Sequence, residues 1–155
     1  MEGHAKKAQD NFYKGYNCAQ SLFLAYCDVT GLSEKSALKL SSALGAGICR
    51  LRETCGAVSG MAMVFGALYG FTSPDDINAK AFFYSEFQPL AFEFKRRSGS
   101  LICRELLGLD VLYDDPVPEP RTADYYKKRK CASYIAAAAE ILDEYIAKRG
   151  TENED

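Results

Sequence analysis

The chain has 155 residues, a formal net charge of −2, 48% hydrophobic residues and 26% charged residues. These values are typical of one globular domain with a sizeable core, and they give no general attraction to nucleic acid or to anionic membranes. No apolar run approaches the roughly 20 residues that span a bilayer, and the N-terminus lacks the apolar segment of a secretory signal peptide. We therefore expect a cytoplasmic protein with no nucleic-acid partner and no membrane insertion, with one domain over residues 1–149 and a disordered polar tail over 150–155.

Almost the whole chain carries helical signals. N-cap residues precede apolar runs with helical spacing, glycines follow them, and neither strict alternation nor a hairpin dipeptide is present. In chain order, the expected helices cover residues 2–13, 18–30 after the N-cap Asn17, 34–44 after the N-cap Ser33, 54–69, 75–97, 101–107 and 122–148. The predicted fold class is all-α, a compact bundle of about six helices with no sheet beyond incidental pairs.

The stretch 50–70 is the most informative part of the chain. It turns at Thr54-Cys55-Gly56 and then runs apolar, with four glycines. Each glycine weakens a helix by about 1 kcal/mol, so that several of them indicate a close approach of another backbone or of a ligand. Thr54 or Glu53 is the expected N-cap, which places Cys55 in the first turn. The helix N-terminus and two upstream arginines would favour its thiolate, although a structural cysteine beside packing glycines is the alternative.

The next helix, 75–97, begins after Ser73-Pro74 and carries an apolar stripe. Its members recur at steps of four and three, as on one helix face: Phe83, Phe87, Leu90 and Phe94. We expect this face to be buried against the central helix or a second subunit. Pro89 should kink the helix.

The C-terminal part holds two more cysteines near helix starts. Cys103 falls in the first turn of the helix 101–107, which Ser100 is expected to cap. A loop over 109–121 contains three prolines, which forbid regular helix there. The last helix is expected to run from Thr122 or Asp124 to Lys148. Cys131 lies on its inner face, and the basic run just upstream should lower the pKa of a nearby thiol.

Six cysteines are the compositional oddity of the chain. None forms a Cys-x-x-Cys pair, which excludes thioredoxin-like and zinc-ribbon motifs, and the bacterial ferredoxin run and the haem-attachment motif are absent. His4 is the only histidine. A Cys-His hydrolase is therefore unsupported, and any metal site would consist mostly of thiolates.

One motif gives the cysteines a context. Cys55-Gly56-Ala57-Val58-Ser59-Gly60 is preceded by Gly15-Tyr-Asn-Cys-Ala-Gln20 and followed by Cys103-Arg-Glu-Leu-Leu-Gly108 and Lys130-Cys131. Over residues 12–147 the chain resembles the family of redox-active proteins denoted C_GCAxxG_C_C for its cysteine pattern. The resemblance implies one functional set, for catalysis or metal binding: Cys18, Cys55, Cys103 and Cys131. It implies a cofactor-binding role for Gly56, Ala57 and Gly60, and it leaves Cys27 and Cys49 outside.

Two classes of function follow. The first is a redox protein, an oxidoreductase or electron carrier, whose four cysteines form a thiol/disulfide centre or hold zinc or an iron–sulfur cluster. It would work with a redox partner protein, as a monomer or homodimer. The second is a non-enzymatic helical module with a structural metal or inert core cysteines, which binds a partner through the aromatic helix. For the first class we expect the four sulfurs to converge, Cys55 to be the most reactive, and Cys49 to be close enough to resolve it.

Overall fold

The computed structural model describes residues 3–152, and over this range the chain is all-α, as predicted. The helices are α1 His4–Tyr13, α2 Cys18–Ala25, α3 Cys27–Thr30, α4 Glu34–Ser41, the 3₁₀ turn η1 Ser42–Leu44, α5 Gly45–Ile48, α6 Gly56–Tyr69, α7 Ile77–Ser98, α8 Cys103–Leu106, α9 Ala123–Lys128 and α10 Cys131–Glu152. The described residues contain no β-strand, and the only pairing outside helices is an isolated antiparallel bridge between Thr54 and Ile102.

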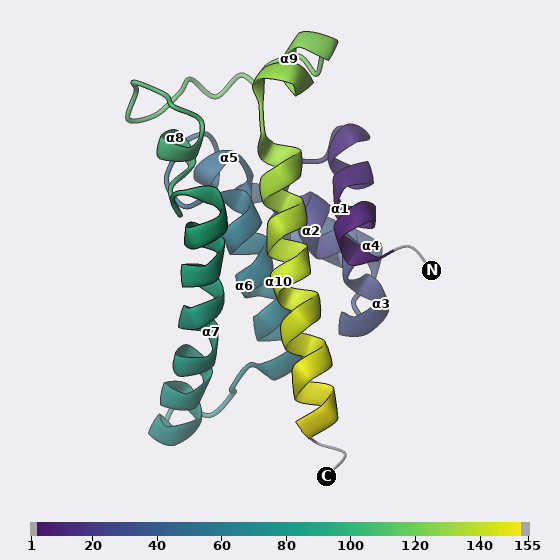
Figure 1. Cartoon of the computed structure of the whole chain (residues 1–155), viewed down its shortest axis with the longest axis vertical. Coiled ribbons are helices and arrows are strands. Elements are labelled where there is room, and N and C mark those ends of the chain that lie inside the picture. Colours follow the sequence, from purple (N-terminus) through teal and green to yellow (C-terminus); the bar gives the residue numbers. More distant parts are fainter. Residues whose placement is uncertain (1–2, 153–155) are drawn as a thin grey trace.

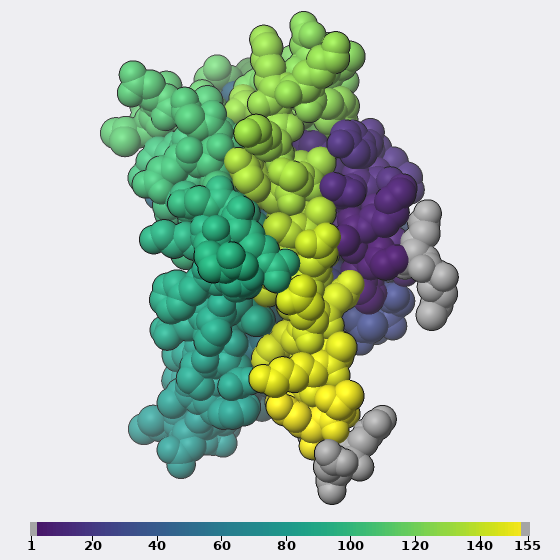
Figure 2. Space-filling model, viewed as in Figure 1, coloured from purple at the N-terminus to yellow at the C-terminus, as the bar shows by residue number. Residues whose placement is uncertain are grey.

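Helix α10 lies between α7 on one side and α1 on the other, with α6 and α2 behind it (Figure 1). In the space-filling view of the same face, α10 lies beside α7 along most of its length, and α1 covers the other side of its upper part (Figure 2). The shared interior holds large side chains that are completely or almost completely buried: Phe12, Leu22, Tyr26, Met61, Phe65, Phe94, Ile135 and Leu142. Among the described residues, no helix combines the length and the apolar character needed to cross a membrane.

Several helix starts agree with the capping signals. Asn17 accepts from the Gln20 amide at 2.9 Å and forms a capping box, while Ser33 accepts from the Ser36 amide and Thr122 from the Tyr125 amide. The start of α7 differs from the expectation, because Asp76 rather than Ser73 accepts the amide hydrogen bond, from Ala79.

Two expected helices are each divided in the structure. The helix 18–30 breaks at Tyr26, whose hydroxyl donates to the Ala139 carbonyl at 2.8 Å. The expected helix 122–148 breaks at Arg129, whose backbone is extended, so that α10 begins anew at Cys131. Residues 150–152, expected in the polar tail, continue α10, while 153–155 lie outside the described residues.

The aromatic face of α7 packs on the central helix, as predicted. The ring centroids of Phe83 and Phe87 lie 4.8 and 5.3 Å from that of Phe65 on α6, and Phe94 is fully buried. These rings pack against an aromatic side chain of α6, Phe65, rather than against its glycines. Two of the glycines of α6 instead face α2.

Gly56 and Gly60 bring α6 close to α2. A Cβ atom at Gly60 would lie 3.1 Å from the Leu22 Cβ and 3.2 Å from the Ala19 carbonyl oxygen. At Gly56 it would lie 2.8 Å from the Cys18 Cβ. The two glycines therefore let two cysteine-bearing helices approach at backbone distance.

Replacing Gly56 with alanine should destabilise the protein by about 1–3 kcal/mol, because the new methyl group meets atoms near the backbone that cannot move away. A Cβ added at Gly66, on the same helix, would have no other atom within 4 Å. Gly66→Ala is therefore the matched control, and it should stabilise the helix by about 0.5–1 kcal/mol. Chemical denaturation measures both changes, and equal effects of the two substitutions would contradict the packing role of Gly56.

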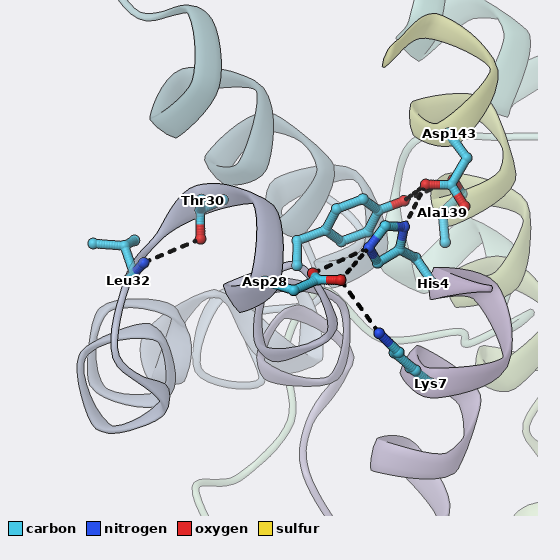
Figure 3. Close-up of polar contacts among 8 residues, drawn as sticks. His4, Lys7, Asp28, Thr30, Leu32, Ala139 and Asp143 are labelled. Atoms are coloured by element: carbon cyan, nitrogen blue, oxygen red, sulfur yellow. Dashed lines mark hydrogen bonds and ion pairs between the residues drawn. The ribbon is translucent and has the colours of Figure 1, made fainter. Parts of the chain in front are cut away.

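The N-terminal helix α1 is anchored to the rest of the bundle by a polar cluster around His4. His4 stacks on Tyr26, with ring centroids 4.1 Å apart, and its two ring nitrogens lie 2.7 Å from Asp143 and 3.1 Å from Asp28 (Figure 3). Lys7 also reaches Asp28. This cluster joins α1 to α3 and α10, at the end of α1 away from the cysteines of the motif.

Candidate thiol site

All four cysteines of the motif lie at helix N-termini. Cys18, Cys103 and Cys131 are the first residues of α2, α8 and α10, and Cys55 is itself the N-cap of α6. This corrects two expectations: the N-cap of α6 is neither Thr54 nor Glu53, and Cys131 starts a helix rather than lying within one. The break at Arg129 is the reason for the second difference, since it separates α9 from α10.

These four cysteines line one cavity of about 50 Å³. The same cavity is lined by three arginines from distant parts of the chain, Arg52, Arg121 and Arg129. The expected convergence of the four cysteines therefore agrees with the geometry, while their chemical roles stay predictions. Of the three small residues expected to bind a cofactor, Gly56 and Ala57 line the cavity, whereas Gly60 faces α2.

A short backbone pairing fixes two of the cysteines. The Cys55 amide donates to the Leu101 carbonyl at 2.8 Å, and the Cys103 amide donates to the Glu53 carbonyl at 2.6 Å. These hydrogen bonds flank the bridge between Thr54 and Ile102. The starts of α6 and α8 are thus held side by side at the cavity.

The segment before this pairing has an unusual backbone. Residues 46–50 and Arg52 all have positive φ, a region that costs a non-glycine residue about 1–2 kcal/mol. Gly47 is the one glycine among them, and a Cβ there would lie 2.7 Å from the Cys103 Cβ. The tight left-handed path brings the Arg52 side chain inward, where it is 5% exposed and donates to the Cys103 sulfur at 3.7 Å. Sequence reasoning treated 45–47 only as a helix end.

Cys131 is the cysteine whose pKa is lowered. The main cause is a hydrogen bond that Cys18 donates to its sulfur, which outweighs the opposing effect of burial. The positive charges of Arg129, Arg121 and Arg52 lower the pKa of Cys131 further. Among the four cavity cysteines, Cys131 alone has a lowered pKa.

The pKa of Cys18 is shifted in the opposite direction. Its hydrogen bond to Cys131, the burial of its sulfur and the negative charge on Cys131 raise the pKa of Cys18 well above the usual cysteine value. Of the two residues, Cys131 is therefore the one that loses its proton at the lower pH. The two residues lie at the starts of α2 and α10 and line the same cavity.

The other two cysteines are held neutral. Burial raises the pKa of Cys55 to about 12, and the backbone amides of Ala57 and Val58, which favour its thiolate, offset only part of this. Burial also raises the pKa of Cys103, against the opposing effect of its hydrogen bond from Arg52. At Cys55 desolvation therefore outweighs the helix N-terminus, contrary to the expected preference for its thiolate, while its reactivity relative to the other cysteines stays a prediction.

Alkaline pH should destabilise the fold through Cys55. An unfolded cysteine loses its proton near pH 8.5, whereas folded Cys55 keeps it to about pH 12, so the unfolded state binds fewer protons between these values. The contribution is fully present below about pH 8.5 and is lost as the pH rises, at up to about 1.4 kcal/mol per pH unit. The midpoint of chemical denaturation, measured as a function of pH, reports this loss of stability. Cys55→Ala should flatten the decline, and an unchanged slope in that variant would contradict the assignment.

Cys27 and Cys49 lie outside the cavity, as expected. Cys27 is partly buried near Asp28 and Glu34, and burial raises its pKa. Cys49 is exposed, within the left-handed segment. All six cysteines are free thiols, and within residues 3–152 no group of three or more His, Cys, Asp or Glu side chains is arranged to hold a metal ion.

Part of the charged lining was missed by sequence reasoning. The basic run before Cys131 contained Arg129, and Arg52 was noted upstream of Cys55, but Arg121 was not singled out. In the structure Arg121 lies beside Cys131 because it donates to the carbonyls of Phe12 and Tyr16, at the end of α1. No local pattern in the sequence signals such a contact.

The fold and the site define a class: an all-helical protein with four cysteines at helix N-termini around a cavity lined with arginines. The chain belongs to the family described as “Putative redox-active protein (C_GCAxxG_C_C)”, which matches residues 16–145. The match includes all four cavity cysteines. Comparison with curated proteins and with solved structures found no significant match.

Proposed function

We propose that this protein is a thiol–disulfide redox protein in which Cys131 is the attacking thiolate and Cys18 is the resolving thiol. The observation that carries the proposal is that Cys18 and Cys131 line one small cavity together with three arginines. The raised pKa of Cys18 and the lowered pKa of Cys131 support the assignment of roles. A disulfide requires two cysteines whose backbones are close, and both of these residues line the same cavity of about 50 Å³. Membership of a redox-active family supports the same reading.

The exchange runs in two steps. The Cys131 thiolate attacks one sulfur of an external disulfide, forms a mixed disulfide with it and releases the first thiolate. The Cys18 sulfur then loses its proton, attacks the Cys131 sulfur and releases the second thiolate. Two protein thiols are oxidised by two electrons, and the external disulfide is reduced to two thiols. One of the protons that these thiols take up comes from Cys18 and the other from solvent.

The surroundings support this assignment of roles. A thiolate attacks best when its pKa lies near the ambient pH, and three guanidinium groups lower that of Cys131 toward this range. Cys55 and Cys103 remain protonated at neutral pH by burial, so they would be spectators in the first exchange. Six free cysteines suit a reducing compartment, so the proposal places the protein in the cytoplasm, where a redox partner protein would renew the dithiol.

Peptide mapping tests the pairing. Reduced protein is oxidised with a stoichiometric disulfide, its free thiols are blocked, and the cross-linked peptides are identified by mass spectrometry. The expected first product joins Cys18 to Cys131. A first product that joins Cys55 to Cys103 or to Cys49 would contradict the proposal.

A bound metal or iron–sulfur cluster is the second candidate, because four cysteines around one cationic cavity could serve as ligands. In the present arrangement these side chains do not form a metal-binding group, so the fit would require them to move inward. Metal analysis and an absorption spectrum of protein purified without oxygen separate the two candidates. Stoichiometric metal or a brown, absorbing cluster would favour the second.

A further inference from the structure

A second, larger cavity adjoins the cysteine cavity. Its volume is about 350 Å³, which lies within the range of small-molecule binding sites. The two cavities share one wall, formed by Asn17, Ala46, Arg52, Arg121 and Tyr125. On the far side of this wall the larger cavity is lined by the left-handed segment and by two prolines of the loop 109–121, Pro116 and Pro118. We refer to this larger cavity as the arginine cleft.

The lining of the arginine cleft is strongly cationic. It contains Arg50, Arg52 and Arg121 but only one carboxylate, Glu119, and that carboxylate already pairs with Arg129. Arg50 and Arg52 share a single acidic partner, Asp114, at 3.9 and 2.7 Å. The cleft therefore has more positive charge than its own acidic groups offset.

Arg121 is the clearest case of an uncompensated charge. Within the described residues it forms no ion pair with a carboxylate. Its guanidinium donates to two backbone carbonyls, Phe12 at 3.2 Å and Tyr16 at 3.1 Å, and it lies over the ring of Tyr125 at 4.8 Å from the centroid. These contacts hold the group in place without neutralising it. A fixed guanidinium is well suited to recognise a carboxylate, because its donors match the two carboxylate oxygens.

We propose that the arginine cleft binds a small disulfide that carries carboxylate groups, and that this compound is the external disulfide of the exchange. Its carboxylates would bind Arg50 and Arg121, and its disulfide would extend past the shared residues into the cysteine cavity, where one of its sulfurs meets Cys131. The inference rests on the proposed function, since it names the substrate class for the same thiol pair. The volume of the cleft suits a small molecule, and the surplus of positive charge disfavours a cationic one.

The test compares three disulfides that differ only in their end groups: dithiodipropionate is anionic, bis(hydroxyethyl) disulfide is neutral and cystamine is cationic. The rate at which each oxidises the reduced protein is divided by its rate with a small free thiol, which removes intrinsic differences in reactivity. We expect the anionic compound to react at least about tenfold faster than the cationic one at low salt. The preference should shrink as the salt concentration rises.

Arg50→Gln should reduce this preference severalfold. Alkylation by neutral iodoacetamide, measured on each variant, corrects these rates for any change in the reactivity of Cys131. Cys49→Asp is a second variant, which adds a negative charge to the cleft wall at a left-handed position that aspartate tolerates. It should reduce the preference as well. Arg96→Gln, on the exposed face of α7, is the matched control and should leave the preference intact.

The outcomes separate the two proposals. If all three disulfides oxidise the protein with equal corrected rates, or if both cleft variants keep the full preference, the cleft inference is overturned while the thiol–disulfide function stands. If none of the three disulfides oxidises the protein, the proposed function itself fails.

Discussion

Cys131→Ser should abolish disulfide exchange by this protein, because serine has no thiolate and burial keeps the pKa values of Cys55 and Cys103 raised. Cys18→Ser should behave differently. It should still form the mixed disulfide at Cys131 but should not release it, because the resolving thiol is missing. Mass spectrometry of each variant after mixing with a small disulfide distinguishes an unmodified chain from a trapped adduct.

Cys27→Ser is the matched control for these two variants. Cys27 lies outside the cavity, on a different part of the surface, so its replacement should leave both the rate and the products unchanged. Retention of full exchange by Cys131→Ser would contradict its role as the nucleophile. Complete exchange by Cys18→Ser would instead show that another thiol resolves the adduct, with Cys55 or Cys103 as the nearest candidates.

Arg129→Gln should raise the pKa of Cys131 by about 1 unit, which is the lower end of the effect of one nearby opposite charge. Arg129 is the largest contributor among the three cavity arginines to the lowered pKa of Cys131. A rise of about 1 unit reduces the thiolate fraction by about tenfold wherever the pH lies below both pKa values. The rate of alkylation by iodoacetamide as a function of pH measures the shift, since only the thiolate reacts.

Because Arg129 lowers the pKa of Cys131, its charge also sets the pH at which alkylation of Cys131 begins. In the wild type, alkylation should set in at a lower pH than for an ordinary cysteine, and in Arg129→Gln its midpoint should move upward. Arg104→Gln provides a control, because Arg104 pairs with Glu53 and is not among the causes of the shift at Cys131. Identical profiles for wild type and Arg129→Gln would contradict the electrostatic account.

The left-handed segment links the charged lining to the cysteines. Positive φ at five consecutive residues, 46–50, turns the chain sharply between η1 and the bridge, and it lets Arg50 and Arg52 share Asp114. Strained backbone of this kind persists where the surrounding structure holds it, and it is often found at functional sites. Here the strained residues form the boundary between the cysteine cavity and the arginine cleft.

The helices could be predicted from the sequence because their signals are local. Asn17, Ser33 and Thr122 cap helices as expected, since each side chain accepts a hydrogen bond from an amide three residues later. The stripe of α7 was also found, because residues three and four apart share one helix face. The family motif identified the four cysteines as a set, although it did not distinguish their roles.

Only the tertiary structure decided which of the cavity cysteines has a lowered pKa. The sequence placed Cys55 at a helix N-terminus after two arginines, and these local features favoured it as the thiolate. The pKa of Cys55 is instead raised by burial, whereas that of Cys131 is lowered by Cys18 and by arginines from separate segments. Burial and charge both depend on which parts of the chain meet in space. The break at Arg129 and the left-handed path of residues 46–50 arise in the same way, because contacts made by distant segments outweigh local helix propensity there.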